Sequence, residues 1–221
     1  MELPTKDVFE QHWSIKEGSA NPENLTNDFY RYMVKTYREP FWVKEDYQVD
    51  DFEYAPLWCF NRLGQSKTVL ADGTIIYIGG EYDDYYDPDF AIYNDVIVIN
   101  SDQITIYGYP WNTFQPTDFH TASYIKKEKC IYIIGCIGYT KNDITPIYKL
   151  NLVDYSISKV ISQGIHPGPI YDHRASYDEA LNCILIDGGK INNSQINKHI
   201  YSLNLATLTW NLIQTDHDQL N

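Results

Sequence analysis

The chain has 221 residues and a formal charge of −13 at pH 7, from 17 basic and 30 acidic side chains. This length suits one domain, or one domain with an extension, and a hydrophobic content of 43% is enough for a folded core. The acidic balance argues against nucleic acids and anionic membranes as direct ligands, because both are bound through clustered Lys and Arg. A basic partner is the natural complement of such a chain.

Residues 1–60 are expected to form an N-terminal helical and aromatic extension. Asn21-Pro22-Glu23 resembles a helix start, and the apolar residues that follow recur at helical spacing. This pattern predicts a helix over residues 22–37 that ends before Pro40, because the residue preceding a proline avoids helical angles. Residues 41–60 alternate aromatic and acidic side chains and are expected to supply one strand.

From residue 61 onward, the chain repeats a unit of about four short strands. Each unit contains a β-branched run, a turn with glycine and then two further strands. Equivalent residues recur at a fixed interval, so that Cys130 and Cys183 stand 53 positions apart. A period near 50 residues with about four strands per unit is typical of propeller blades. The predicted units cover about 62–110, 117–161 and 170–213.

A glycine pair, an aromatic residue and a tryptophan mark the third unit. Gly188-Gly189 follows the apolar run, Tyr201 leads the next strand, and Trp210 lies in the last strand. The second unit has Gly135-Cys136 in place of the glycine pair and lacks the tryptophan. Over residues 62–212 the pattern resembles the Kelch repeat. The resemblance implies a mainly β fold, a partial or small β-propeller of about three four-stranded blades, and a role as a protein-binding platform.

Three units are fewer than the four to eight blades of an ordinary closed propeller. An open stack leaves sheet edges and faces exposed, which favours aggregation. We therefore expect residues 1–60 to pack on the propeller of residues 61–221 and to cover one open face. Self-association that completes a ring is the alternative.

The acidic charge is concentrated in the first unit. Residues 68–125 contain nine acidic side chains and no Lys or Arg, and most of these acids lie in the loop of residues 81–90. Acids complement a basic partner, and Tyr and Trp supply flat contact surface at interfaces. The candidate partner-binding residues are Glu81, Tyr82, Asp83, Asp84, Tyr85, Tyr86, Asp87, Asp89 and, in the loop after the first unit, Trp111.

The acidic loop also has two simpler interpretations. Its Asp residues can cap turns in a solvated loop. Calcium binding is a second interpretation, but the loop lacks the Asp-x-Asp-x-Asp-Gly order of the known calcium loop, so we predict no metal or other cofactor. A second acidic run at residues 45–53 either extends the same surface or forms a solvated linker.

His120 and His173 occupy equivalent places in the second and third units. Nearby aspartates suggest acid–base chemistry. The repetition favours instead a structural hydrogen bond between units, shared with Ser123 and Ser176, and the spacing puts Gly64 at this place in the first unit. Nucleophile elbows and phosphate-binding glycine loops are absent from the sequence, so we predict no catalytic residue.

The cysteines and the N-terminal residues predict a reduced, cytoplasmic protein. The first residues lack the basic and apolar stretches of a secretory signal, and no apolar run has membrane-spanning length. The cysteines form no CxxC pair and lie in or beside apolar runs. They are Cys59, Cys130, Cys136 and Cys183.

Three functions are compatible with these features, and the sequence favours the first. It is a binding protein without chemistry of its own, similar in charge and size to bacterial immunity proteins and other inhibitors of basic nuclease toxins. The second is a propeller enzyme acting on a carbohydrate through carboxylates around a funnel; however, the acids cluster in one loop instead of recurring in each unit. The third is a structural subunit that self-associates.

Overall fold

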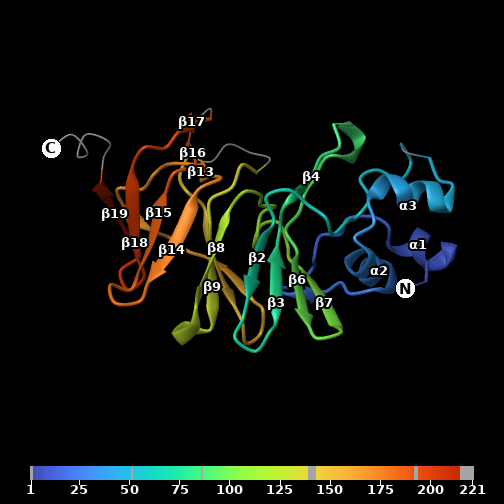
Figure 1. Cartoon of the computed structure of the whole chain (residues 1–221), viewed down its shortest axis with the longest axis horizontal. Coiled ribbons are helices and arrows are strands. Elements are labelled where there is room, and N and C mark those ends of the chain that lie inside the picture. The colour runs from blue at the N-terminus through green and yellow to red at the C-terminus, as the bar shows by residue number, and fades with distance from the viewer. Residues whose placement is uncertain (1, 51, 86, 139–142, 192–193, 215–221) are drawn as a thin grey trace.

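The computed structural model describes residues 2–50, 52–85, 87–138, 143–191 and 194–214 (Figure 1). It is a mainly β protein with several antiparallel sheets, which confirms the predicted fold class at this level. Helices gather at the N-terminal end of the molecule, and the sheets follow one another toward the C-terminal end.

The N-terminal segment differs from the prediction at two places. The predicted helix over residues 22–37 is wrong at its start: α2 spans Asp28–Thr36, because Asn27 is its N-cap and accepts a hydrogen bond from the Tyr30 N–H at 2.8 Å. The strand expected within residues 41–60 is also wrong. Helix α3 covers Pro40–Tyr47, with Pro40 in the first turn, where its missing N–H costs nothing. The other N-terminal elements are α1 (Lys6–His12) and β1 (Glu23–Asn24).

Three four-stranded antiparallel meanders follow along the chain. The first meander contains β2 (Ser66–Val69), β3 (Ile75–Ile78), β6 (Val96–Asn100) and β7 (Gln103–Gly108). The second contains β8 (Thr121–Ile125), β9 (Cys130–Ile134), β10 (Ile147–Asn151) and β11 (Ile157–Lys159). The third contains β14 (Arg174–Asp178), β15 (Cys183–Asp187), β18 (Ile200–Asn204) and β19 (Thr209–Gln214).

Shorter elements extend these meanders. Strand β1 pairs with the outer edge of the first, and β12 (Gln163–Gly164) runs parallel to β19 in the third. Two small sheets lie in the connections: β4 (Glu81–Tyr82) with β5 (Ala91–Ile92), and β13 (Ile170–Tyr171) with β16 (Lys190–Ile191) and β17 (Gln195–Ile196). The short 3-10 helices are η1 (Asp87–Asp89) and η2 (Lys126–Glu128).

The first strands of successive meanders adjoin, so that β8 lies between β2 and β14. One backbone hydrogen bond is repeated at each junction. The Phe119 N–H donates to the Gly64 carbonyl at 2.9 Å, and the Asp172 N–H donates to the Phe119 carbonyl at 2.8 Å. All three residues have left-handed φ angles between 47° and 60°. The sequence repeat therefore corresponds to a repeated three-dimensional junction.

Both repeated histidines bridge successive meanders. His120 Nε2 lies 2.8 Å from Ser66 Oγ, and His173 Nε2 lies 2.9 Å from Thr121 Oγ1. The structural interpretation is confirmed, although the partners are these two hydroxyls and not those of the predicted Ser123 and Ser176. Both histidines are buried.

Strand register corrects the alignment of the first unit at the histidine position. Ser66 pairs with Ile78 and Thr121 pairs with Ile134, and in each case the second residue precedes the glycine turn. The residue before Ser66 is therefore the equivalent of His120. That residue is Gln65, not Gly64; its side chain donates to the Gly79 carbonyl at 3.3 Å.

Apolar clusters fill the junctions between meanders. Ile76 and Val98 of the first meander pack with Ile133 and Leu150 of the second. The opposite face of the second meander packs on the third in the same way. All four cysteines lie within the described residues, where they are buried and form no disulfide. A third cluster joins the N-terminal helices to the first meander and contains Phe9, Phe29, Met33, Trp58, Ile97 and Ile106.

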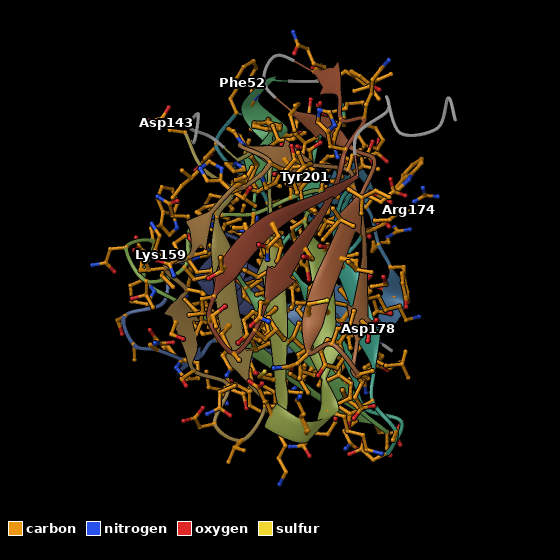
Figure 2. All side chains as sticks on the ribbon, turned by 90° about the vertical axis from the view of Figure 1, so that its left-hand side faces the viewer. Phe52, Asp143, Lys159, Arg174, Asp178 and Tyr201 are labelled. Carbon is orange, nitrogen blue, oxygen red and sulfur yellow. The ribbon has the colours of Figure 1, made fainter. Side chains whose placement is uncertain are left out.

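The outer face of the third meander, which is turned toward the viewer in Figure 2, carries polar side chains that include Arg174 and Asp178. Ile78 and Ile134 face the next meander in the first two units, whereas Asp187 stands at the same register position in the third. Asp187 forms an exposed ion pair with Arg174, the register equivalent of Ser66 and Thr121. Polar outer faces are typical of terminal repeats, because no further repeat covers them.

A buried ion pair joins Arg62, which closely follows the N-terminal segment, to Asp95, which precedes β6 of the first meander. The Arg62 side chain is fully buried and forms two hydrogen bonds with Asp95, at 2.5 and 2.9 Å. The guanidinium also donates to the Gly79 carbonyl and lies 3.4 Å above the Tyr93 ring. Asp95 accepts a further hydrogen bond from the Trp58 indole at 2.8 Å. The opposite charges of Arg62 and Asp95 are thus paired inside the protein, and both side chains are hydrogen-bonded there.

We predict that Arg62→Met lowers the free energy of unfolding by about 3–5 kcal/mol, because it leaves the Asp95 carboxylate buried without its cation. The matched control is Arg174→Met, which breaks an ion pair whose side chains are 83% and 48% exposed and should cost at most about 1 kcal/mol. Urea denaturation measures both. Equal losses in the two variants would contradict the role given to the buried pair.

A second prediction concerns the two buried histidines. Burial lowers the pKa of His120 to about 3 and that of His173 to about 4. An unfolded histidine titrates near pH 6.5, so the unfolded chain takes up protons that the native state excludes as the pH falls below that value. The contribution of each buried, neutral histidine to the unfolding free energy is therefore fully present above about pH 6.5. About 2 kcal/mol of unfolding free energy per histidine should be lost at pH 5.

The variant His120→Gln tests this pH dependence, because its amide nitrogen can keep the bond to Ser66 without titrating. We expect the loss of unfolding free energy between pH 7 and pH 5 to be smaller by about 2 kcal/mol in the variant than in the unmodified protein. Identical losses in denaturant titrations at the two pH values would disprove the assignment.

Candidate functional site

The acidic loop leaves the end of β3 and returns through β5, with η1 near its tip. It rises above the first meander beside α3 (Figure 1). Because β3 and β7 both pair antiparallel with β6, the loop and Trp111 leave the same end of this meander. Trp111 is half-exposed, and its backbone N–H donates to Glu17 at 2.7 Å.

The candidate residues of the loop differ in exposure. Asp84 is exposed, and Tyr85 is 98% exposed. Asp83 is half-buried, and its carboxylate accepts a hydrogen bond from the Tyr85 N–H at 2.7 Å. Tyr86 lies outside the described residues, and Asp87 begins η1. Asp83, Asp84 and the tyrosine that follows them therefore form a short turn, with Asp84 and Tyr85 exposed to solvent.

Asp89 is buried and holds the loop to the helical segment. Its carboxylate lies 2.5 Å from the ammonium group of Lys44, and the two side chains are 6% and 3% exposed. Lys44 belongs to α3, 45 residues earlier in the chain. The carboxylate of Asp89 is thus used inside the protein, where it fixes the loop to α3.

Glu81 lies where the loop begins, between the first and second meanders. It forms an isolated bridge with Leu63, and burial together with the nearby Asp118 carboxylate raises the pKa of Glu81 to about 7. Asp118 is fully buried and accepts hydrogen bonds from the backbone N–H groups of Ile137 and Gly138, at 3.0 and 2.8 Å. Glu81 therefore keeps its proton to a higher pH than an exposed glutamate does.

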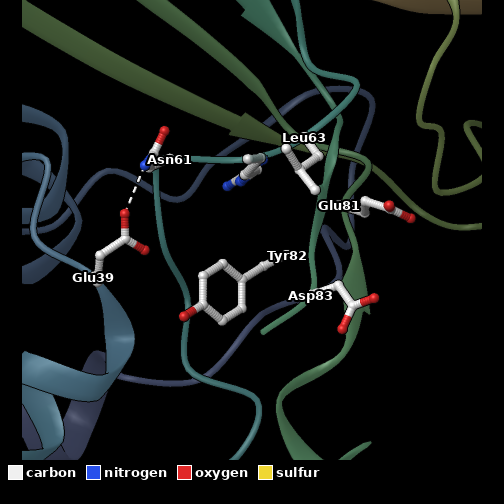
Figure 3. Close-up of a pocket in the computed structure, with 7 residues that line it drawn as sticks. Glu39, Asn61, Leu63, Glu81, Tyr82 and Asp83 are labelled. Carbon is white, nitrogen blue, oxygen red and sulfur yellow. Dashed lines mark hydrogen bonds between the residues drawn. The ribbon is translucent and has the colours of Figure 1, made fainter. Parts of the chain in front are cut away.

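A cavity of about 200 Å³ lies between the start of α3 and β4 (Figure 3). Tyr82 projects into it, and Glu39 accepts a hydrogen bond from Asn61 at 2.6 Å on the opposite wall. Burial raises the pKa of Tyr82, so this phenol stays neutral. The lining residues are Glu39, Asn61, Arg62, Leu63, Glu81, Tyr82 and Asp83.

The lining of this cavity has an excess of negative charge. Its one cation, Arg62, is already bonded to Asp95, whereas Glu39, Glu81 and Asp83 carry carboxyl groups. Such a lining can accept a cationic group or a hydrogen-bond donor. Within the described residues, no group of three or more His, Cys, Asp or Glu side chains is arranged to hold a metal ion.

Sequence reasoning missed the contribution of α3 to this region. The second acidic run begins inside this helix, where Glu45 and Asp46 are exposed and Asp46 is bonded to Arg38 at 2.7 Å. The signal that could have revealed the helix is Pro40, which is favoured at a first helical position as well as after a helix end. The pairing of Lys44 with Asp89 has no such signal, since it joins distant parts of the chain.

Comparison of the chain with family models and with curated proteins finds no match. None of the helices in the described part of the chain combines the length and apolar character that a membrane span requires. Function must therefore be argued from the geometry and charge of the site itself.

We predict that Glu81→Gln makes the change in unfolding free energy from pH 5 to pH 8 more positive by about 1 kcal/mol than in the unmodified protein. The raised pKa of Glu81 means that the native state holds a proton that the unfolded chain releases above about pH 4.5, so stability falls as the pH rises toward 7. Glu81 is partly exposed, so solvent screens its interactions. We therefore expect it to lower the unfolding free energy of the unmodified protein by about 1 kcal/mol between pH 5 and pH 8. Denaturant titration at both pH values measures it, and an unchanged pH profile would contradict the carboxyl pairing.

Proposed function

We propose that this protein is a non-catalytic binding module built on a small Kelch-like propeller of about three blades. Support for the blades comes from three successive four-stranded meanders whose first strands adjoin. The glycine pairs that mark the repeat, such as Gly79-Gly80 and Gly188-Gly189, have positive φ angles. In this proposal, residues 61–221 form the blades and residues 1–60 form an extension on the first blade.

The partner of this module is a basic protein, bound through the acidic, Tyr-rich loop. The observation that carries this proposal is the anchoring of the loop: the buried Lys44–Asp89 pair holds it, while Asp83, Asp84 and Tyr85 form its solvent-facing turn. An anchored loop loses less conformational entropy on binding than a free one. Carboxylates beside a tyrosine suit a surface rich in Lys and Arg.

The most specific form of the proposal is an inhibitor, or immunity protein, that blocks the cleft of a basic toxin nuclease in the cytoplasm. Such a cleft is positively charged because it binds phosphates. A projecting acidic loop can occupy it by charge complementarity, without any covalent step. The two repeated histidines are committed to junctions between meanders and take no part.

One observation favours a second candidate, a carbohydrate-directed enzyme. Glu81, with its pKa raised to about 7, has the property of a general acid beside the carboxylate of Asp118. Turnover of a glycan library by the unmodified protein, abolished in Glu81→Gln, would support this candidate over the first.

The binding proposal predicts that Asp83→Asn/Asp84→Asn loses the partner. Immobilised protein should retain one basic protein from an extract of its native host at low salt and release it at high salt, because exposed charges are screened. A control that also removes two charges is Asp102→Asn/Glu179→Gln, whose residues are exposed outside the acidic loop and should not affect capture. Equal capture by the two double variants would refute the role of the loop.

A further inference from the structure

Helix α3 presents two large aromatic side chains to solvent. Phe41 and Trp42 are 48% and 49% exposed, and their rings meet edge to face with centroids 5.1 Å apart. The other side of the helix is packed: Val43 and Tyr47 are buried in the cluster under the N-terminal helices. About half of the surface of each aromatic side chain therefore remains open to solvent, although α3 is packed on its other side.

The acidic loop is attached to the helix that carries this aromatic pair. Lys44, one helical turn after Phe41, makes the buried ion pair with Asp89 of the loop. Tyr85 of the same loop is exposed. In Figure 1, the loop rises beside α3, in agreement with this contact.

The charges of this composite surface are mainly negative. Asp84 and Glu45 are exposed, and Glu39 lies at the cavity between α3 and β4. Two nearby cations are already paired: Lys44 with Asp89, and Arg38 with Asp46. The excess charge that remains is complementary to a basic partner.

We propose that the α3 aromatic pair and the acidic loop form one docking surface for an arginine-bearing segment of a basic protein. This inference rests on the proposed function and adds to it the residue type that the surface prefers. A guanidinium plane can stack on an aromatic ring while it donates to a carboxylate, whereas an ammonium group offers no such plane. The aromatic rings thus supply the anchor and the acids supply the charge complement.

The test uses the full chain with nona-arginine and nona-lysine peptides as probes, titrated by calorimetry at low salt. In Phe41→Ala/Trp42→Ala, the dissociation constant for nona-arginine should rise about tenfold, and that for nona-lysine should rise about twofold at most. The control Leu181→Ala removes another exposed apolar side chain, from the third meander, and should change neither constant. Thermal midpoints check that all variants are folded.

The outcomes separate this inference from the proposed function. If Asp83→Asn/Asp84→Asn weakens both peptides but the aromatic variant binds nona-arginine as the unmodified protein does, the inference is overturned and the acidic loop stands. If the charge variant binds both peptides unchanged, the proposed function itself fails. The single variant Trp42→Ala repeats the measurement with a smaller perturbation and should weaken nona-arginine selectively.

Discussion

The buried pair between Arg62 and Asp95 is the constraint on which the N-terminal half of the structure depends. It brings the segment that follows the helices against the strand that follows the acidic loop. The charge is tolerated there because the guanidinium donates to the Asp95 carboxylate and to the backbone carbonyls of Cys59 and Gly79, and stacks over the Tyr93 ring. The neighbouring Trp58 indole also donates to Asp95, and the Lys44–Asp89 pair holds α3 beside the loop.

The second and third meanders are held in place by contacts that recur at each junction. Each junction reuses one backbone bond between left-handed residues and one side-chain bond from a histidine to a hydroxyl. Apolar side chains fill the space between successive meanders. The third meander departs from the pattern on its outer face, where Asp187 and Arg174 replace residues that would otherwise be covered. These charges oppose the stacking of a further meander or of a second copy on that face, because a covering sheet would desolvate them.

The candidate site lies where the N-terminal segment contacts the first meander. The loop belongs to the first meander, and the helix that holds it belongs to the N-terminal segment. Asp89 and Glu81, two acids of one short loop, consequently have different roles. Asp89 is an internal anchor, whereas the pKa of Glu81 is raised by burial and by the nearby Asp118. Net charge alone does not distinguish such acids from those exposed at the turn.

The sequence by itself determined the mainly β class, the strands at 75–78, 130–134 and 183–187, and the structural role of the histidines. It could do so because runs of β-branched residues indicate strands, and residues that recur at a fixed interval indicate a repeated local structure. It also located the acidic loop. Only the tertiary structure decided the helix at Pro40–Tyr47, the equivalence of Gln65 with His120, and the pairing of Lys44 with Asp89. Those features depend on register and on contacts between distant residues, which local pattern does not encode.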